Sequence, residues 1–216
     1  NNIPMSTYTI FKPYLLNALL STETKVVIIA VESLVQMMDD EVEGYLLSVL
    51  GKNEAVDSII LGNLQNTGKA FVLLAERYES SAFDQKKNVM GFIMPRIREI
   101  SETNDKEMMR VRASLFDALA IDWADSDEEM RLLMVDALFY LDEERAFAFF
   151  AQLIDGSETW MRITTLEMVG SASHGRTTDL LVKFSNDDDL QVRECVHAVL
   201  NSRGLMTEDT ESTGAL

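Results

Sequence analysis

The chain has 216 residues, with 36 Asp or Glu against 19 Lys or Arg, so its formal net charge is −17. A hydrophobic content of 47% is ample for a folded core, and it excludes a chain that is disordered throughout. One cysteine, Cys195, and two histidines exclude a disulfide framework and a site where Cys and His bind a metal. We therefore expect no metal or other cofactor and a reducing compartment, the cytoplasm.

The sequence also argues against insertion into a membrane. Its longest apolar run, 26–31, is far shorter than the roughly 20 residues that a membrane-spanning helix needs. The N-terminal region lacks the basic flank and long apolar stretch of a signal peptide, and residues 1–4, ahead of Met5, look like a remnant of cloning.

The composition predicts an all-α fold, because good helix formers dominate and only 3 Pro and 10 Gly interrupt them. Apolar residues recur at helical spacing over 24–37, 41–50, 55–64, 69–79, 85–101, 106–121, 127–141, 143–154, 158–169, 177–184 and 189–202. Gly51 is suited to the left-handed conformation that ends a helix, and Pro95 should kink or break the helix that contains it. The tail, 204–216, is expected to be disordered.

A repeat is visible in the C-terminal half. Arg131, Arg162 and Arg193 are spaced by 31 residues, and an acid stands four residues before each of them. These acids are Asp127, Glu158 and Asp189. The residues expected to cap the helices that carry the arginines are Ser126, Ser157 and Asp188. Each unit thus opens with a capped, arginine-bearing helix, and the intervening segments 143–154 and 177–184 supply the partner helices.

The segments 156–170 and 187–200, with an acidic turn, an apolar residue followed by Arg, and a helix, resemble HEAT or armadillo-like repeats. The resemblance covers about 122–203 and implies an α-solenoid of stacked antiparallel helix pairs, continuous with a less regular helical-repeat half over 5–121. It also implies that Arg131, Arg162 and Arg193 form a structural ladder, with Asp127 and Asp189 as their acidic counterparts. Glu158 departs from this pattern in the middle unit.

Some positions do not fit the repeat. Arg112 resembles a further ladder arginine but lies only 19 residues before Arg131, which leaves no room for a full helix pair. One of these two alignments is therefore false, or a helix is missing. Thr165 and His197 also occupy positions that are apolar in the sibling units.

A search for catalytic chemistry finds no residues to carry it. Cys195 and His197 are two residues apart on one predicted helix and so point to different faces. His174 lies in a loop with no partner that the sequence reveals. The sequence has no phosphate-binding loop, zinc-protease motif or nucleophile elbow, and its acidic runs at 125–129 and 186–189 lack the glycine of a calcium loop. No catalytic or metal-binding residue is expected.

Charge is the more informative feature. From Ile121 to Arg145 there are nine acids against two arginines, a net charge of −7 in one repeat. Such density repels phosphates and anionic lipid, so we expect neither nucleic acid nor a membrane as the partner. The positive charge is concentrated only at Lys86, Lys87, Arg96 and Arg98.

The sequence thus predicts a non-enzymatic protein-binding module, such as an adaptor, a chaperone or an immunity-type inhibitor. Its partner would be a protein or peptide, and the charge favours a basic one. The expected contact residues are Glu128, Glu129, Asp136, Glu167, Asp187 and Asp188. An acidic surface that only keeps the solenoid in solution explains the same charges equally well.

Two other interpretations remain open. One is an enzyme on a HEAT-like scaffold, similar to the lyases that attach bilins or to the alkylpurine glycosylases. The glycosylase interpretation is disfavoured, because those enzymes need a basic groove with aromatic residues. Here the two tryptophans, Trp123 and Trp160, both lie beside acids. The other is a fragment of a larger scaffold.

Overall fold

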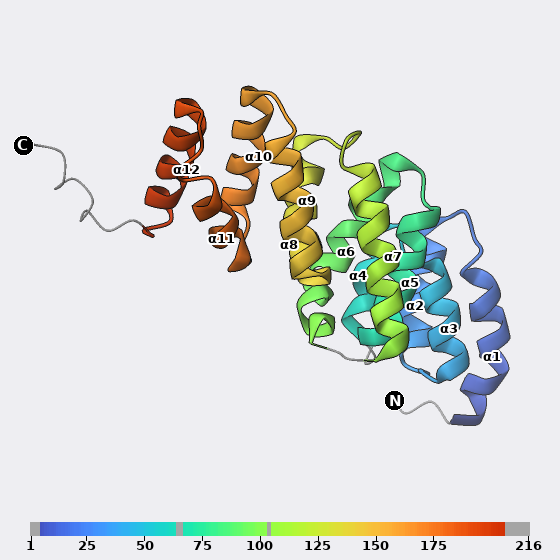
Figure 1. The fold of residues 1–216 in the computed structure, drawn as a ribbon. Helices are drawn as coiled ribbons and strands as arrows, with labels where there is room; N and C mark the ends of the chain where they lie inside the picture. The colour runs from blue at the N-terminus through green and yellow to red at the C-terminus, as the bar shows by residue number, and fades with distance from the viewer. Residues whose placement is uncertain (1–4, 64–66, 103–104, 206–216) are drawn as a thin grey trace, which may run out of the picture. The chain divides into compact units, whose positions relative to one another are not determined.

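The computed structural model describes residues 5–63, 67–102 and 105–205, which form twelve α-helices and no strand (Figure 1). Their bounds are α1 Met5–Ala18, α2 Thr24–Val35, α3 Asp40–Val49, α4 Glu54–Asn63, α5 Thr67–Ser80, α6 Phe83–Ser101, α7 Lys106–Asp122, α8 Glu128–Leu141, α9 Glu143–Asp155, α10 Thr159–Ser171, α11 Arg176–Lys183 and α12 Leu190–Ser202. The predicted all-α fold is confirmed. Most of the predicted disordered tail lies outside the described residues.

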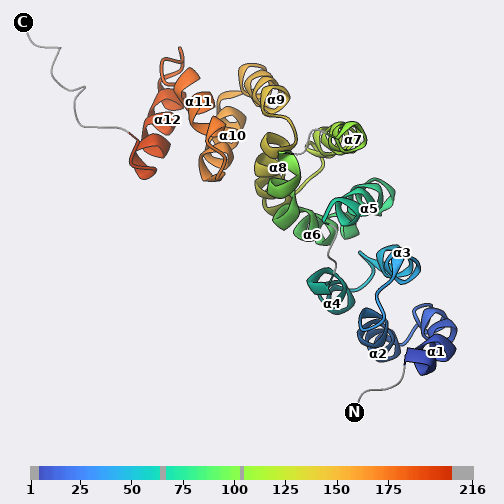
Figure 2. The same ribbon diagram turned by 90° about the horizontal axis from the view of Figure 1, so that it is seen from below.

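The helices divide into two compact units, Asn1–Val111 and Arg112–Leu216. The sequence predicts one continuous domain with a change of regularity after residue 121, whereas the boundary between the units falls inside α7. In unit 1, α2 contacts both α1 and α4, α3 contacts α5, and α5 packs on α6. In unit 2, α10 contacts α8, α9, α11 and α12. Figure 2 shows odd- and even-numbered helices as two layers within each unit.

The first helix, α1, is not among the predicted ones, because Pro13 lies in its interior and its apolar stripe is weak. Of the two outcomes predicted at Pro95, a kink or a break, the break is wrong, since α6 continues through this residue. The Arg96 guanidinium donates a hydrogen bond to the Phe92 carbonyl at 3.0 Å, beside the position where the proline lacks an N–H. Gly51 has φ +80°, as predicted for the residue after α3, and its N–H donates to the buried Asp57 carboxylate.

The core of unit 2 is aromatic at its centre. The Trp123 ring meets that of Phe150 edge-on, with centroids 5.2 Å apart, and Phe150 stacks on Phe139 at 5.7 Å. The arginine-bearing helices α8, α10 and α12 are the second helices of their pairs. Apolar residues at equivalent places on them, such as Met134 and Val196, are fully buried. The side chain of Thr165 lies between them in the register, and its hydroxyl donates to the Met161 carbonyl. A polar residue is therefore accommodated at this apolar position because its own helix satisfies it.

The predicted helix caps are displaced by one residue. Asp127 caps α8 by accepting a hydrogen bond from the Met130 N–H, and Asp189 caps α12 by accepting one from the Gln191 N–H. Ser126 and Ser157 instead donate to the carbonyls of Asp122 and Leu153 in the preceding helices. The serines therefore satisfy carbonyls at the C-terminal end of one helix, and the acids after them begin the next.

Candidate functional site

The repeated arginines of unit 2 bind the turns between helices. Arg131 donates to the carbonyls of Trp123 and Ala124, and Arg193 donates to those of Asp187 and Asp188. In both cases the carbonyls belong to the turn just before the arginine's own helix. These two arginines therefore have the same structural role, two repeats apart.

The middle arginine has a different partner. Arg162 on α10 forms an ion pair with Asp187, in the turn before α12. Asp189, the counterpart implied by the family resemblance, caps α12 and accepts a hydrogen bond from the Thr159 hydroxyl at 2.6 Å. This bond, the Gln191 N–H and the nearby Arg162 charge hold the pKa of Asp189 below its ordinary value of 3.8. Arg162 therefore forms a rung to the following repeat, but the acid lies two residues earlier than expected.

Arg112 is not a further member of the ladder. It lies on α7 and donates to the Tyr140 and Leu141 carbonyls at the end of α8. Arg203 acts similarly on α10, donating to the Gly170 carbonyl at 2.7 Å and to that of Ala172. The alignment of Arg112 with Arg131 is therefore false, since Arg112 belongs to the first helix of its pair.

Asp136 and Asp187, both predicted to contact a partner, bind groups of their own chain. Asp136 accepts hydrogen bonds from the Ser173 N–H, the Ser173 hydroxyl and the His174 N–H, and so fixes the loop between α10 and α11. The side chain of Asp187 is only 9% exposed and pairs with Arg162. Both carboxylates are structural, because their oxygens hold neighbouring repeats together.

The other four predicted acids, Glu128, Glu129, Glu167 and Asp188, are exposed. The 31-residue register places Glu129 on α8 at the same position as Trp160 on α10, and Leu132 on α8 at the same position as Glu194 on α12. Because α10 contacts both α8 and α12, these positions form one surface. We call it the second-helix face and define it by its exposed residues Glu128, Glu129, Leu132, Trp160, Glu167, Leu190 and Glu194.

Trp160 belongs to this face but is not among the residues predicted to contact a partner. Its side chain is 64% exposed in the first turn of α10, and its Nε1–H donates to Glu158 Oε2 at 3.0 Å. Glu158 occupies the N-cap position of α10 but makes no side-chain cap hydrogen bond. The signal was present in the register, because the sibling residues of Trp160 are the polar Glu129 and Gln191. The register therefore singles out Trp160 as a large apolar residue at a position that is polar in both neighbouring repeats.

The charge of the chain is concentrated in unit 2. Residues 112–216 contain 21 acids against 8 basic residues, so they carry −13 of the net charge of −17. All eight basic side chains bind groups of the same unit. Beyond the arginines described above, Arg145 pairs with Asp117, Arg176 with Glu144 and Asp179, and Lys183 with Asp155. Little positive charge is therefore left to neutralise the second-helix face.

The side chains considered for catalysis have structural surroundings. The ring of His174 stacks on that of Phe139 with centroids 5.5 Å apart, and its Nδ1 accepts a hydrogen bond from the Arg176 N–H. Cys195 is half-buried on α12, and burial, together with the charge of Glu167, raises the pKa of its thiol. His197, two residues along α12, is exposed. Among the described residues, no cluster of Asp, Glu, His and Cys side chains could hold a metal ion.

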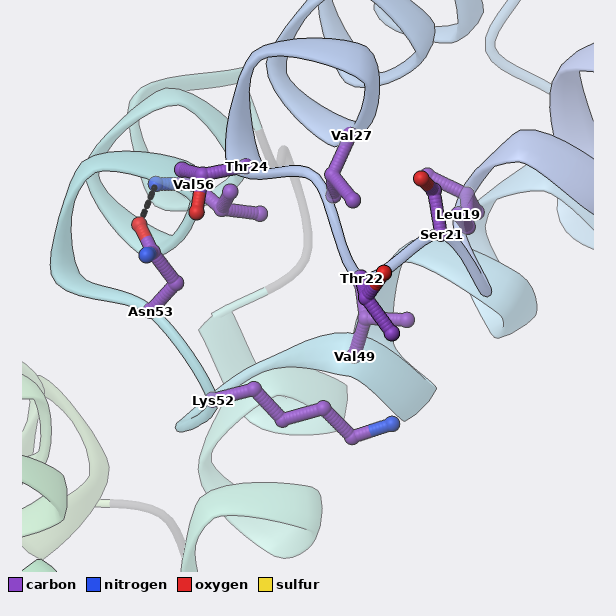
Figure 3. Close-up of a pocket in the computed structure, with 9 residues that line it drawn as sticks. All are labelled: Leu19, Ser21, Thr22, Thr24, Val27, Val49, Lys52, Asn53 and Val56. Atoms are coloured by element: carbon purple, nitrogen blue, oxygen red, sulfur yellow. Dashed lines mark hydrogen bonds between the residues drawn. The ribbon is translucent and has the colours of Figure 1, made fainter.

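Unit 1 contains a small cavity of about 180 Å³ between the turns that precede α2 and α4 (Figure 3). Apolar side chains and hydroxyls line it, with Lys52 at its edge. The Asn53 side chain accepts hydrogen bonds from the N–H groups of Ala55 and Val56 and so begins α4. The volume is below the roughly 300 Å³ of ordinary small-molecule sites, and the cavity is the gap between two helix turns.

Comparisons with known proteins were made against families, curated proteins and solved structures. No family model matches the chain, and no curated protein matches it significantly. The chain is similar to an engineered protein at 12% identity and a TM-score of 0.35, over 88% of this chain and 95% of that one. It is also similar to a designed armadillo repeat protein at 15% identity and a TM-score of 0.26, over 90% of this chain and 99% of the designed one.

The helix pairs themselves define the class of fold. Successive second helices in unit 2 carry equivalent residues 31 positions apart, and each contacts the next. The architecture is an α-solenoid of HEAT/armadillo-like helical repeats, which confirms the resemblance seen in the sequence. Within the described part of the chain, no helix is both long and apolar enough to cross a membrane.

Proposed function

We propose that this protein is a non-enzymatic binding module that holds a basic protein or peptide on the second-helix face of unit 2. The observation that carries the proposal is that unit 2 has a large negative net charge, while its own basic side chains are already bound within the unit. Unit 2 has a net charge of −13, and its basic side chains are all engaged within the unit, so the exposed acids attract cations from outside.

The form of the surface supports the same function. Stacked helix pairs present an extended face that suits a protein or peptide. The second-helix face combines exposed acids with exposed apolar side chains, among them Trp160 and Leu190. Interfaces commonly combine aromatic anchors with a charged rim, so both binding energy and steering are available here.

The proposal includes the absence of catalysis. The His174 ring packs on Phe139, Cys195 is half-buried, and burial raises the pKa of its thiol. A role as an adaptor, a chaperone or an inhibitor of a basic protein fits a surface of this kind, and a reducing compartment such as the cytoplasm fits the free thiol.

The test measures binding of a short oligo-arginine peptide and of an oligo-lysine peptide of equal length by isothermal titration calorimetry and stopped flow. Both peptides should bind at about 0.1 M salt, where the Debye length is about 10 Å, and association should slow strongly as salt approaches about 1 M. Replacing Glu128, Glu129 and Glu167 together by Gln should weaken binding of both peptides. Glutamine is preferred to lysine because Glu128 and Glu129 also lie in the first turn of α8, where positive charge would oppose the helix dipole.

The matched control replaces exposed glutamates of unit 1, Glu32 and Glu76, by Gln. These positions are exposed on helices outside the second-helix face, so peptide binding should change little. If the control variant loses as much affinity as the unit 2 variant, or if neither peptide binds the parent protein at low salt, the proposed function is wrong.

A further inference from the structure

Several aromatic rings of unit 2 have a positively charged side chain of the same chain lying over them. Guanidinium groups lie over three of these rings: Arg145 over Phe116 at 4.1 Å, Arg176 over Phe147 at 5.3 Å and Arg131 over Trp123 at 5.7 Å. The Lys183 ammonium lies 4.7 Å from the Phe184 ring centroid. Such contacts arise because the negative face of an aromatic ring attracts a cation.

Trp160 differs from these residues. Its ring is 64% exposed, and none of the described Lys and Arg side chains lies over it. Its edge is fixed, because Nε1–H donates to Glu158 Oε2 at 3.0 Å. Trp160 therefore presents an oriented aromatic face in an acidic unit, without the cation that neighbouring aromatics have.

Glu158 is also unlike its siblings. Asp127 and Asp189, one repeat away on either side, each cap their helix with a carboxylate oxygen. Glu158 stands at the same position but makes no cap hydrogen bond, and its carboxylate lies at the indole instead. Only Oε2 is engaged by the indole, so the second oxygen can accept a hydrogen bond from a cation placed over the ring.

We propose that Trp160 and Glu158 together form the docking point for an arginine side chain in a basic segment of the partner. The guanidinium would stack on the indole while one of its N–H groups donates to Glu158 Oε1. This inference rests on the proposed function, since it names the residue type that the second-helix face binds.

Arginine fits the site better than lysine. Its guanidinium is planar and less strongly hydrated than an ammonium, so it stacks on an indole while its N–H groups donate hydrogen bonds in the guanidinium's own plane. The exposed Leu190, which begins α12, adds an apolar contact beside the site.

The experiment titrates the full chain with oligo-arginine, oligo-lysine and oligo-citrulline peptides of equal length and follows both tryptophan fluorescence and calorimetric affinity. Oligo-citrulline is the uncharged analogue of oligo-arginine. Trp160 should dominate the change in fluorescence, because Trp123 is buried. We expect oligo-arginine to bind more tightly than oligo-lysine and to change the fluorescence, whereas oligo-citrulline should do neither.

Three variants locate the site. Trp160→Ala should weaken binding of oligo-arginine about 2- to 5-fold and remove most of its advantage over oligo-lysine. Glu158→Gln keeps an acceptor for the indole N–H but loses the charge, and it should lower the affinity for oligo-arginine. Glu158→Asp should raise the melting temperature, because it supplies the missing cap, and yet lower the affinity for oligo-arginine. A purely structural Glu158 would not separate stability from binding in this way.

Tyr14→Ala is the matched control, since Tyr14 is an aromatic residue of unit 1 that is 73% exposed. It should leave binding unchanged. If Trp160→Ala binds oligo-arginine as the parent does while the Gln variant of Glu128, Glu129 and Glu167 is weakened, the arginine site is wrong and the proposed function stands. If the parent protein binds neither cationic peptide, both are wrong.

Discussion

Arg162 on α10 forms an ion pair with Asp187, which lies in the turn before α12 and so belongs to the following repeat. Both side chains are largely withdrawn from solvent, with exposed fractions of 16% and 9%. Asp187 also accepts a hydrogen bond from the Asp189 N–H at 2.9 Å, so the pair fixes the turn that begins α12. The position of α12 on α10 therefore depends partly on one partly buried charge pair.

Removing one member of this pair should be costly. We expect Arg162→Ala to lower the free energy of unfolding by about 1 to 3 kcal/mol, because it leaves the Asp187 carboxylate partly buried without its cation. Urea unfolding followed by circular dichroism measures the change. The double variant Arg162→Ala with Asp187→Asn should lose less than the sum of the two single variants. Strict additivity, or an unchanged unfolding midpoint for Arg162→Ala, would show that the pair contributes nothing.

The sequence explains why Arg131 does not form the equivalent rung. The residue one repeat before Asp187 is Gly156, so Arg131 has no acid at the equivalent place in the following turn. The register predicts which positions are equivalent, but it does not say which of the three consecutive acids 187–189 faces the arginine. That choice depends on the shape of the turn, where Asp189 serves as a cap and Asp187 points back to α10.

Other differences between prediction and structure have similar physical causes. The helices, the 31-residue register and the left-handed Gly51 follow from local patterns and were predictable. The role of Asp136 was not, because its partners Ser173 and His174 lie 37 and 38 residues away. The unit boundary inside α7 likewise depends on contacts between distant helices, which local periodicity does not encode.

The capping carboxylate of Asp189 should make unit 2 sensitive to acid. Its folded-state pKa lies below the ordinary value of 3.8, chiefly because the Thr159 hydroxyl donates to it. A lowered pKa means that this stabilisation is complete above the unfolded-state pKa and is lost as the pH falls through the folded-state pKa. The melting temperature of the parent should therefore exceed that of Asp189→Asn at neutral pH, and the difference should shrink progressively below about pH 3.8.

Thr159→Val provides the control for the cause of this shift. It removes the hydroxyl and should bring the pKa of Asp189 closer to its ordinary value, as measured by the carboxyl chemical shift in an NMR titration. A difference in melting temperature between the parent and Asp189→Asn that does not change with pH would contradict the stabilising role of the ionised Asp189 carboxylate.

Cys195 should react slowly with thiol reagents. Burial and the charge of Glu167 raise the pKa of its thiol above 9.0, so the thiolate fraction at neutral pH is lower than in an exposed cysteine. Iodoacetamide should therefore modify the folded protein more slowly than the same protein in urea. Cys195→Ser should bind oligo-arginine as the parent does, whereas loss of binding in a folded Cys195→Ser variant would place the thiol in the site.

The contact between α10 and α12 depends on a residue without a side chain. A Cβ atom on Gly170 would lie 2.2 Å from Val199 Cγ1, and the Gly170 carbonyl accepts a hydrogen bond from Arg203 at 2.7 Å. Alanine is the better helix former by about 1 kcal/mol, so helix propensity alone predicts that Gly170→Ala is stabilising. We expect the steric term to prevail, and Gly170→Ala should lower the free energy of unfolding by about 1 to 3 kcal/mol.

Val199→Ala in the same chain removes the clashing methyl groups and should restore most of this loss, although Val199→Ala alone is destabilising. Urea unfolding of the parent, both single variants and the double variant measures the coupling. Additive losses would mean that α10 and α12 can separate at this point without cost, and the close approach would then not be what holds the last repeat in place.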